Sequence, residues 1–336
     1  MASVFIIAEA GVNHNGSLDL ALKLVDAAKK SGADAVKFQT FQAELLATRS
    51  AHKAAYQERT TSDSESQFDM LRRLELDAAA HQEILQHCRK VGIQFLSSPF
   101  DEQSADLLES LDVPLFKVPS GEITNLPFLE HLARKRRPLI VSTGMSTLGE
   151  VEEAVHAMQA AGATQLTLLH CVTEYPAPYD QINLRAMQTL KTVFGSPVGY
   201  SDHTPGIEIA IAATALGAEV IEKHFTLDRS LPGPDHAASL EPAALAEMVR
   251  SIRHVEAALG NGIKVPAPCE VANISVARKS VVAARELCAG HQLASGDLVI
   301  KRPGNGISPS LLPALIGRTL RTPVLKDEVI RWDQMK

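Results

Sequence analysis

The amino-acid sequence predicts an α/β protein in which a (β/α)₈ barrel is followed by a small, mostly β domain. Three observations lead to this prediction. Eight short apolar runs alternate with stretches of helical apolar spacing. Several of those stretches end on a glycine just before the next apolar run. After residue 260 the alternation stops, and short β-like pieces with glycine turns take its place. Because 45% of the 336 residues are apolar, the chain can bury a large core.

The strand-like runs lie at residues 4–10, 35–40, 93–98, 115–119, 138–143, 166–171, 197–201 and 220–226. Segments such as "SLDLALKLVDAAKKSG" and "LGEVEEAVHAMQAAG" separate them and have the apolar spacing of helices. Gly32, Gly92, Gly162 and Gly217 stand where helices would end. Apolar strands separated by helices indicate a parallel sheet that is covered on both faces. A closed barrel fits better than an open sheet, because no GxGxxG or GxxxxGK[ST] motif occurs.

Two parts of the chain depart from this alternation. Residues 41–80 are too many for a strand-to-helix loop, so we expect an insertion over the barrel mouth. The last barrel helix, near residues 242–260, ends at Gly260. We therefore assign residues 1–262 to a catalytic barrel, 263–279 to a linker and 280–336 to a small domain. So small a domain needs to pack on something to be stable.

Charge and cysteine usage narrow the class of protein. The net charge is −6 and basic residues form no long run, so nucleic acid is not an expected partner. The four cysteines are far apart and form no CxxC motif, which is typical of a reduced compartment. The opening residues lack a signal-peptide pattern, and the sequence contains no long uninterrupted apolar segment. We expect a cytoplasmic protein that does not associate with membranes.

Small hydroxyl side chains end four of the predicted strands, in "SSPF", "PSGE", "STGM" and "YSDHTPG". Hydroxyls, backbone N–H groups and helix N-termini bind oxyanions such as phosphate. Lys37 and Lys117, inside the same barrel, would supply the positive charge. The strand ends therefore favour an anion site, although serine and threonine at these positions also simply begin helices.

His203 and His224 end two consecutive strands. Neighbouring strands are about 4.8 Å apart, so two inward imidazoles could share one divalent ion. An open site for Mn²⁺ or Mg²⁺, completed by water and substrate, suits two histidines better than a structural zinc site. Two unrelated histidines that cap strands are the alternative.

Two further functions fit parts of the sequence. A buried lysine in a barrel can form a Schiff base with a carbonyl substrate, as in lysine-dependent aldolases. The small C-terminal domain could instead make the chain a non-catalytic glycan- or ice-binding protein. The many polar strand ends argue against that second alternative.

Ten segments, in this order, carry a family resemblance: "IIAEAGVNHNG", "AVKFQTF", "FLSSPFD", "FKVPSGEITN", "VSTGM", "YPAP", "GYSDHTPG", "EKHFTLDR", "PGPDHAASLEP" and "KRPGNGISP". Together they resemble the sialic acid synthases, which include N-acetylneuraminate synthase and its legionaminate and pseudaminate relatives. The resemblance implies a (β/α)₈ TIM barrel followed by an antifreeze-like (SAF, β-clip) domain. It also implies a domain-swapped homodimer, in which the SAF domain of one subunit closes the barrel of the other.

The resemblance further implies condensation of phosphoenolpyruvate with an N-acetylated mannosamine-type sugar, with release of phosphate. His203 and His224 would hold Mn²⁺ or Mg²⁺, and Glu122 would activate the attacking water. The phosphoenolpyruvate contacts implied are Lys37, Ser98, Lys117, Ser120, Ser142 and Ser201. The sugar contacts implied are Glu9, Gln39, Tyr175, Asp235 and, from the swapped domain, Arg302.

One segment, "VTEYPAP", departs from the pattern of some family members. Those members have asparagine where this chain has Thr173, followed here by Glu174. We therefore assign no role to Thr173. The "TEYPAP" form is more similar to the legionaminate branch, whose sugar is a 2,4-diacetamido-6-deoxy compound.

Overall fold

A computed structural model of the protein describes residues 3–61 and 65–336. It divides the chain into two compact units, Met1–Gly260 and Asn261–Lys336. The strands of the first unit are β1 Phe5–Gly11, β2 Ala35–Thr40, β3 Gln94–Pro99, β4 Phe116–Val118, β5 Leu139–Ser142, β6 Leu166–Cys171, β7 Val198–Asp202 and β8 Val220–His224. Each overlaps one of the eight predicted apolar runs.

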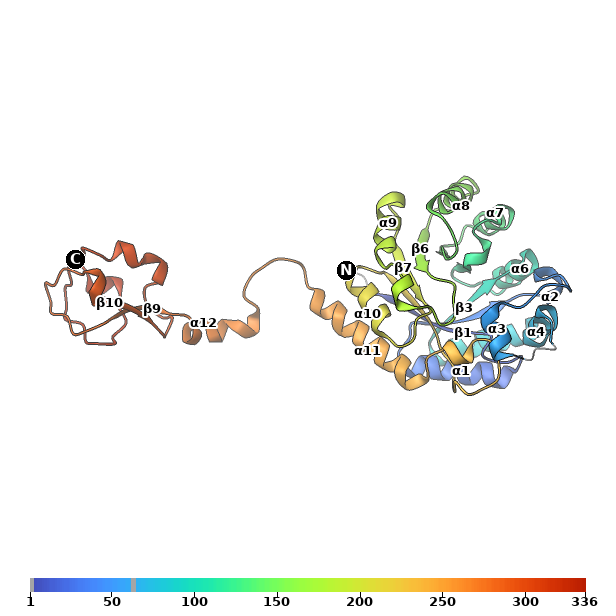
Figure 1. The fold of residues 1–336 in the computed structure, drawn as a ribbon, viewed down its shortest axis with the longest axis horizontal. Helices are drawn as coiled ribbons and strands as arrows, with labels where there is room; N and C mark the ends of the chain where they lie inside the picture. The colour runs from blue at the N-terminus through green and yellow to red at the C-terminus, as the bar shows by residue number, and fades with distance from the viewer. Residues whose placement is uncertain (1–2, 62–64) are drawn as a thin grey trace. The chain divides into compact units, whose positions relative to one another are not determined.

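The eight strands form one parallel sheet in the order β3-β2-β1-β8-β7-β6-β5-β4. Because β3 and β4 also contact each other, the sheet closes on itself. Helices surround the strands in Figure 1. They are α1 Leu18–Lys30, α5 Ala78–Val91, α6 Glu102–Ser110, α7 Leu126–Arg134, α8 Leu148–Ala160, α9 Arg185–Phe194, α10 Glu208–Ala215 and α11 Pro242–Leu259. The predicted (β/α)₈ barrel is confirmed.

Local sequence chemistry explains where the outer helices begin and end. Thr147 caps α8, and its backbone N–H donates to Glu150 in a capping box. α5 ends at Gly92, whose φ of 75° places it in the left-handed region that favours glycine. The apolar face of each helix packs on outward strand residues such as Ile6 and Phe38, and this layer is the main core.

The interior of the barrel is filled below its mouth. Ile7, Leu96, Ile140, Leu169 and Val220 point inward from five strands and form a separate apolar cluster. A side chain at Gly199 would meet Leu169 and the Val220 backbone at under 3.0 Å, so this inward position accepts only glycine. This apolar cluster, the plug of the barrel, fills the lower part of the interior. The carboxyl ends of the strands above it remain for polar side chains.

The segment that the sequence marks as an insertion contains three short helices, α2 Ala43–Leu46, α3 Ala55–Thr60 and α4 Gln67–Leu74. Ser66 caps α4 by accepting from the Asp69 backbone N–H at 3.1 Å. The insertion has its own small core, in which Met70 and Leu74 pack with Phe41.

The second unit contains α12 Val271–Ala277 and the antiparallel strands β9 Ser280–Ala283 and β10 Leu298–Lys301. The remainder is turns, isolated bridges and short 3₁₀ helices around a small apolar core. α12 lies within residues 263–279, where the sequence predicts only a linker. Its two nearby prolines, Pro266 and Pro268, both precede the helix and so do not interrupt it. Within the described residues of either unit, no helix has the length and apolar character needed to cross a membrane.

Candidate functional site

The carboxyl ends of the barrel strands bring inward side chains together. Glu9 on β1 stands level with Lys37 on β2 and with His224 on β8. Ser201 on β7 stands level with Glu222 on β8. Because side chains alternate along a strand, Glu222 and His224 face inward while Lys223 faces outward. The polar groups thus form a layer above the apolar plug.

A cavity of about 240 Å³ opens over this layer. Twelve of the residues that the resemblance implied line it: Glu9, Lys37, Gln39, Ser98, Lys117, Ser120, Ser142, Tyr175, Ser201, His203, His224 and Asp235. Side chains of the α2–α4 insertion line it too, so the insertion does border the barrel mouth as expected. Of the residues predicted within this unit, Glu122 is not in the lining.

Two buried lysines, Lys37 and Lys117, and two buried glutamates, Glu9 and Glu222, form one charge network at the bottom of the cavity. We call this network, with the hydroxyl groups beside it, the floor of the pocket. The Lys37 Nζ lies 2.7 Å from Glu9 Oε2 and donates to Ser98 Oγ at 3.0 Å. Glu222 lies between the lysines, 3.5 Å from Lys117 Nζ and 3.8 Å from Lys37 Nζ. Pairing of this kind offsets the cost of burying four ionisable groups.

Burial and ion pairing shift the pKa values of these buried groups in different directions. Burial raises the pKa of Glu9 to about 7, against the opposing effect of Lys37. Burial also opposes ionisation of Glu222, but Lys117 and Lys37 together lower its pKa to about 2. Burial alone would lower the pKa of Lys37, but Glu222 and Glu9 raise it. The floor therefore keeps Glu222 ionised and Lys37 charged.

Hydroxyl groups gather beside Lys117. Ser120 Oγ accepts from the Gly144 backbone N–H at 2.9 Å. Among the described residues, the buried hydroxyls of Ser142 and Thr173 have no hydrogen-bond partner. A Cβ on Gly144 would meet Thr173 and Ser120 hydroxyls at under 3.0 Å, so these groups converge on a spot that only glycine leaves open. Unpartnered hydroxyls next to an ammonium group suit an oxyanion.

His203 and His224 meet at the mouth, with ring centroids 5.5 Å apart. His203 Nδ1 donates to the Val172 carbonyl at 2.6 Å, which leaves Nε2 as an acceptor. The Nδ1 of His224 has no hydrogen-bond partner in the described part of the chain. Burial lowers the pKa of both imidazoles, so both are neutral.

These two neutral imidazoles fit a divalent metal ion, because each has a buried ring nitrogen available for coordination. No group of three or more His, Cys, Asp or Glu side chains in the described residues could hold a metal. An ion bound to His203 and His224 would therefore need water or substrate to complete its shell.

The groups expected to hold the sugar lie beside the histidines. The Glu9 and Gln39 side chains and one Asp235 oxygen all lie within 3.6 Å of a Cβ placed on Gly11. The Tyr175 ring packs at a tilt of 37° against His203, with 4.3 Å between centroids, and at the same tilt against Tyr56 of α3, with 4.9 Å. Polar groups on one side and aromatic faces on the other are typical of a carbohydrate site.

Of the residues predicted within the barrel, Glu122 does not line the pocket. Glu122 lies in the 3₁₀ turn Ser120–Glu122, and its carboxylate accepts from Asn125 Nδ2 at 2.7 Å. Arg302 lies in the second unit, where its Nε donates to the Ala277 carbonyl at 3.0 Å. The turn after β4 places Ser120 and Gly121 in the cavity lining, which does not include Glu122.

Comparison with known proteins identifies the family to which the fold belongs. The profile described as the NeuB family matches residues 24–264, and that of the SAF domain matches residues 278–336. The chain belongs to the NeuB family. Its second unit is accordingly a SAF domain, and both predictions of fold class and family are confirmed.

Several relatives of this NeuB-family chain are synthases of sugar acids. It is 51% identical to N,N'-diacetyllegionaminic acid synthase of Campylobacter jejuni, over 98% of this chain and all of that protein. It is 38% identical to human N-acetylneuraminate-9-phosphate synthase, over 97% of this chain and 91% of that protein. The crystal structure of N-acetylneuraminic acid synthetase from Leptospira borgpetersenii matches with a TM-score of 0.72 and 37% identity, over 81% of this chain and 90% of that one. The chain is therefore an enzyme.

The sequence prediction did not assign Glu222 to the site of this NeuB-family enzyme. Its position two residues before His224, on the same strand face, was the available signal. Asp202 faces outward: it accepts from Thr204 and, at 2.8 Å, from the buried Lys223 Nζ. This outer ion pair joins β7 and β8 directly behind the two histidines.

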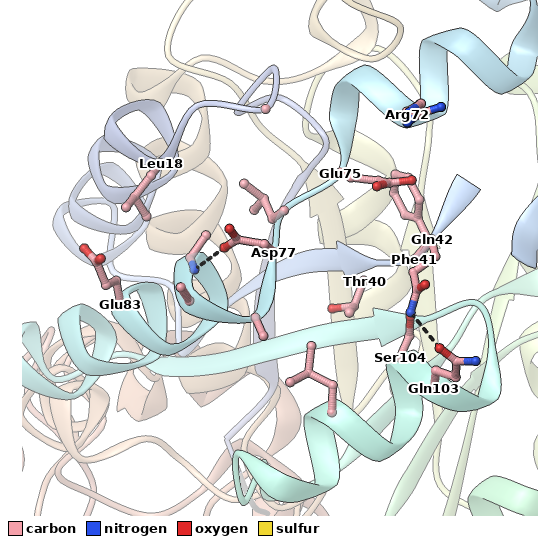
Figure 2. Close-up of a pocket in the computed structure, with 16 residues that line it drawn as sticks. Leu18, Thr40, Phe41, Gln42, Arg72, Glu75, Asp77, Glu83, Gln103 and Ser104 are labelled. Atoms are coloured by element: carbon pink, nitrogen blue, oxygen red, sulfur yellow. Dashed lines mark hydrogen bonds between the residues drawn. The ribbon is translucent and has the colours of Figure 1, made fainter. Parts of the chain in front are cut away.

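A larger cavity, of about 770 Å³, lies outside the barrel between α1, α5 and α6 (Figure 2). Figure 2 shows Gln42 hydrogen-bonded to Gln103 at one end of it. The charged side chains Arg72, Asp77 and Glu83 lie apart around its rim. Its described lining has one cationic side chain, the exposed Arg72, and its buried hydroxyls, on Thr40 and Ser104, are already hydrogen-bonded. This cavity therefore lacks the chemistry of the strand-end pocket.

Proposed function

We propose that this NeuB-family enzyme is a nonulosonic acid synthase that condenses phosphoenolpyruvate with an N-acetylated mannosamine-type aldehyde and water. The products are phosphate and either N-acetylneuraminate or N,N'-diacetyllegionaminate. The observation that carries the proposal is the pairing of an anion floor, built on Lys37 and Lys117, with two neutral histidines at the mouth of the same pocket. The sugar-acid synthases among its relatives support it.

In the proposed binding mode, Lys37 and Lys117 hold the phosphate and carboxylate groups of phosphoenolpyruvate. Ser98, Ser120, Ser142 and Ser201 supply hydroxyl donors around them. The chain is net acidic, so this local cluster must provide the positive potential that draws in a trianionic substrate. The unpartnered Ser142 hydroxyl gains a partner when the substrate binds.

The residues Glu9, Gln39, Tyr175 and Asp235 orient the sugar so that its aldehyde carbon lies next to C3 of phosphoenolpyruvate. His203 and His224 would hold Mn²⁺ or Mg²⁺, which when bound polarises the aldehyde as a Lewis acid. A C–C bond then forms between these two carbons, and the aldehyde oxygen becomes a hydroxyl.

Water completes the reaction at C2. Its oxygen bonds to C2 and one of its protons passes to a carboxylate, which in turn protonates the former aldehyde oxygen. The second proton leaves with the phosphate as the C2–O bond to phosphate breaks and the C2 carbonyl forms. We assign the proton acceptor to Glu122, whose pKa is raised by burial. For this role its side chain must turn from Asn125 toward the pocket. Cover from the SAF domain, with Arg302 reaching the N-acetyl group, would exclude bulk water.

Metal removal and isotope labelling test this proposal. Treatment with EDTA should abolish phosphate release from phosphoenolpyruvate and a mannosamine-type sugar, and added Mn²⁺ or Mg²⁺ should restore it. Phosphoenolpyruvate labelled with ¹⁸O at its bridging oxygen should release unlabelled sugar acid and labelled phosphate. Full activity without detectable metal, or label in the sugar acid, would overturn the mechanism.

The alternative is Schiff-base chemistry, and the lowered pKa of Lys117 favours it, because burial reduces the charge on this amine. Its 3.5 Å contact with ionised Glu222 works in the opposite direction. Borohydride reduction in the presence of the keto-acid product should leave the intact protein mass unchanged. A reduced adduct on Lys117 would support the aldolase instead.

A further inference from the structure

The outer ion pair of Asp202 and Lys223 lies behind the two histidines, and the proposed reaction makes no use of it. Asp202 is completely buried and Lys223 is 1% exposed. The Lys223 Nζ lies 2.8 Å from Asp202 Oδ2. Well-packed apolar residues often stabilise such a position as well as two buried charges do. A buried pair at this place therefore suggests a role besides stability.

The outer ion pair lies where the sheet stops holding one of the histidines. The backbone ladder between β7 and β8 ends with Asp202 level with Lys223. His203 follows directly, outside β7. His224, in contrast, is still within β8 and stands level with Glu9 of β1. Of the two candidate metal ligands, His203 thus depends on side-chain contacts for its position.

The outer ion pair supplies these contacts on both sides of His203. Asp202 Oδ1 accepts from the Thr204 backbone N–H at 2.9 Å and from the Thr204 hydroxyl at 2.8 Å. The Lys223 Nζ donates to the Thr204 carbonyl as well as to Asp202. The residues before and after His203 are therefore tied to each other and to β8.

Two more hydrogen bonds set the orientation of His203. Its Nδ1 donates to the Val172 carbonyl at 2.6 Å, and its own carbonyl accepts from the Ala177 N–H at 2.9 Å. Its Nε2 lies 3.5 Å from the Ser201 hydroxyl, which lines the pocket. Because Val172 and Ala177 belong to the segment between β6 and α9, they can hold the ring only where the outer ion pair places its backbone.

On the basis of the metal site proposed above, we propose that Asp202 and Lys223 are positioning residues for the metal. The outer ion pair fixes His203 relative to His224, with the ring centroids 5.5 Å apart, so that both imidazoles reach one divalent ion. Neither residue of the pair touches the ion or a substrate. The loss of residues that orient metal ligands typically lowers metal affinity by about 10- to 100-fold.

The test measures Mn²⁺ binding to the metal-free, full-length enzyme by isothermal titration calorimetry. The variant combines Asp202→Asn with Lys223→Met, because removing both charges leaves neither one buried and unpaired. Asparagine keeps an oxygen for Thr204, whereas methionine cannot donate to the Thr204 carbonyl. We expect the dissociation constant for Mn²⁺ to rise at least about 10-fold.

Phosphoenolpyruvate binding, measured without metal, separates positioning from general damage to the barrel. Ser201 and Glu222 belong to the floor and lie inside the ladder between β7 and β8, so they stay in place without the outer ion pair. The dissociation constant for phosphoenolpyruvate should therefore change less than about 3-fold, which is less than 1 kcal/mol. A loss equal to that for Mn²⁺ would overturn the positioning role.

The matched control combines Asp34→Asn with Arg253→Met. This pair has an N–O distance of 2.7 Å, and Asp34 also accepts from the Ile6 N–H at 2.8 Å. It has similar chemistry but lies at the amino ends of β1 and β2, away from the histidines. Its removal should change the Mn²⁺ affinity by less than about 3-fold. Thermal unfolding verifies that each variant is folded, and Asp202→Asn alone replaces the double variant if the latter is not.

The possible results distinguish this inference from the function on which it rests. If the folded variant binds Mn²⁺ as tightly as the wild type, or if the control loses as much affinity, the positioning role is overturned and the proposed function stands. If the wild type itself binds no Mn²⁺, the proposed metal site fails, and the inference fails with it.

Discussion

At the scale of single residues, Glu222 governs the balance of charge in the pocket. It accepts from Ser201 Oγ at 3.0 Å and lies within 3.8 Å of both buried lysines. In the absence of substrate, it is the group that offsets the second ammonium charge, since Glu9 is paired with Lys37. The phosphate of a bound substrate can offset this ammonium charge in place of Glu222. Glu222 therefore contributes most to stability when no substrate is bound.

We therefore predict that Glu222→Gln destabilises the free enzyme by about 3 kcal/mol, the cost of leaving a buried charge poorly compensated. Phosphoenolpyruvate should raise the melting temperature of this variant more than that of the wild type, because its anionic groups supply the missing charge. Differential scanning fluorimetry with and without the ligand measures both effects.

The control is Glu219→Gln, which removes a half-exposed carboxylate that is 3.5 Å from Lys191 and outside the pocket. Its effect should stay below about 1 kcal/mol. A Glu222→Gln enzyme as stable as the wild type, or one that gains less from phosphoenolpyruvate, would contradict this account of the floor.

At the scale of elements, Asp297 holds together the turn that precedes β10. Its carboxylate accepts from His291 Nε2 at 2.7 Å, from the Ala294 backbone N–H at 2.9 Å and from Arg285 Nε at 3.0 Å. The hydrogen bond from His291, then that from Ala294 and the contact with Arg285, lower the pKa of Asp297 to about 2. In a unit with so small a core, this turn contributes a large share of local order.

Because the pKa of Asp297 is lowered in the folded state, the stability of the SAF domain should fall as the pH falls. A carboxyl whose pKa is lower in the folded state stabilises it fully above the unfolded value, which is about 3.9, and loses this effect as the pH falls toward 2. We predict that the SAF domain loses about 1–2 kcal/mol of stability over that range, and that Asp297→Asn removes a similar amount at pH 7.

Trp332, the single tryptophan of the chain, lies in this domain, so its fluorescence during urea unfolding of the full chain reports on the domain. Asp327→Asn is the matched control, because Asp327 pairs with Lys301 in the same unit but at an exposed position. The prediction does not hold if Asp297→Asn unfolds at the same urea concentration as Asp327→Asn.

At the scale of the whole molecule, the segment that leads into the SAF domain exposes apolar side chains. Ile263, Val265, Val271 and Val276 are each between 58% and 68% exposed. An exposed apolar stretch of this kind is typical of a surface that packs on another chain. Such a stretch would be covered if two subunits exchange their SAF domains, as the family resemblance implies, each supplying Arg302 to the barrel of the other.

Mixed subunits test this exchange. Arg302→Ala and His203→Ala homodimers should each be inactive or nearly so, because every site lacks one of the two residues. After the two variants are unfolded and refolded together, we expect roughly a quarter of wild-type activity to return, because mixed dimers contain one intact site. If the mixture stays inactive while refolded wild type recovers, each barrel uses its own SAF domain or none.

Much of this architecture is present in local sequence patterns. Apolar runs separated by helical spacing locate all eight strands, and alternation along residues 220–226 suffices to place Glu222 and His224 on one strand face. Nearness to a strand end in the sequence does not predict whether Glu122 lines the pocket, because in the turn after β4 its carboxylate is hydrogen-bonded to Asn125. The helix α12 is not predicted, since the prolines that precede it make the whole segment resemble a linker.

The sequence by itself determined the barrel, the SAF domain, the family and most of the residues around the pocket, because spacing and motifs are local properties of the chain. Only the tertiary structure decided how those residues act on one another. The contact of Glu222 with two lysines and the convergence over Gly11 each join segments far apart in the chain. Such relations depend on the closure of the barrel, which no local pattern specifies.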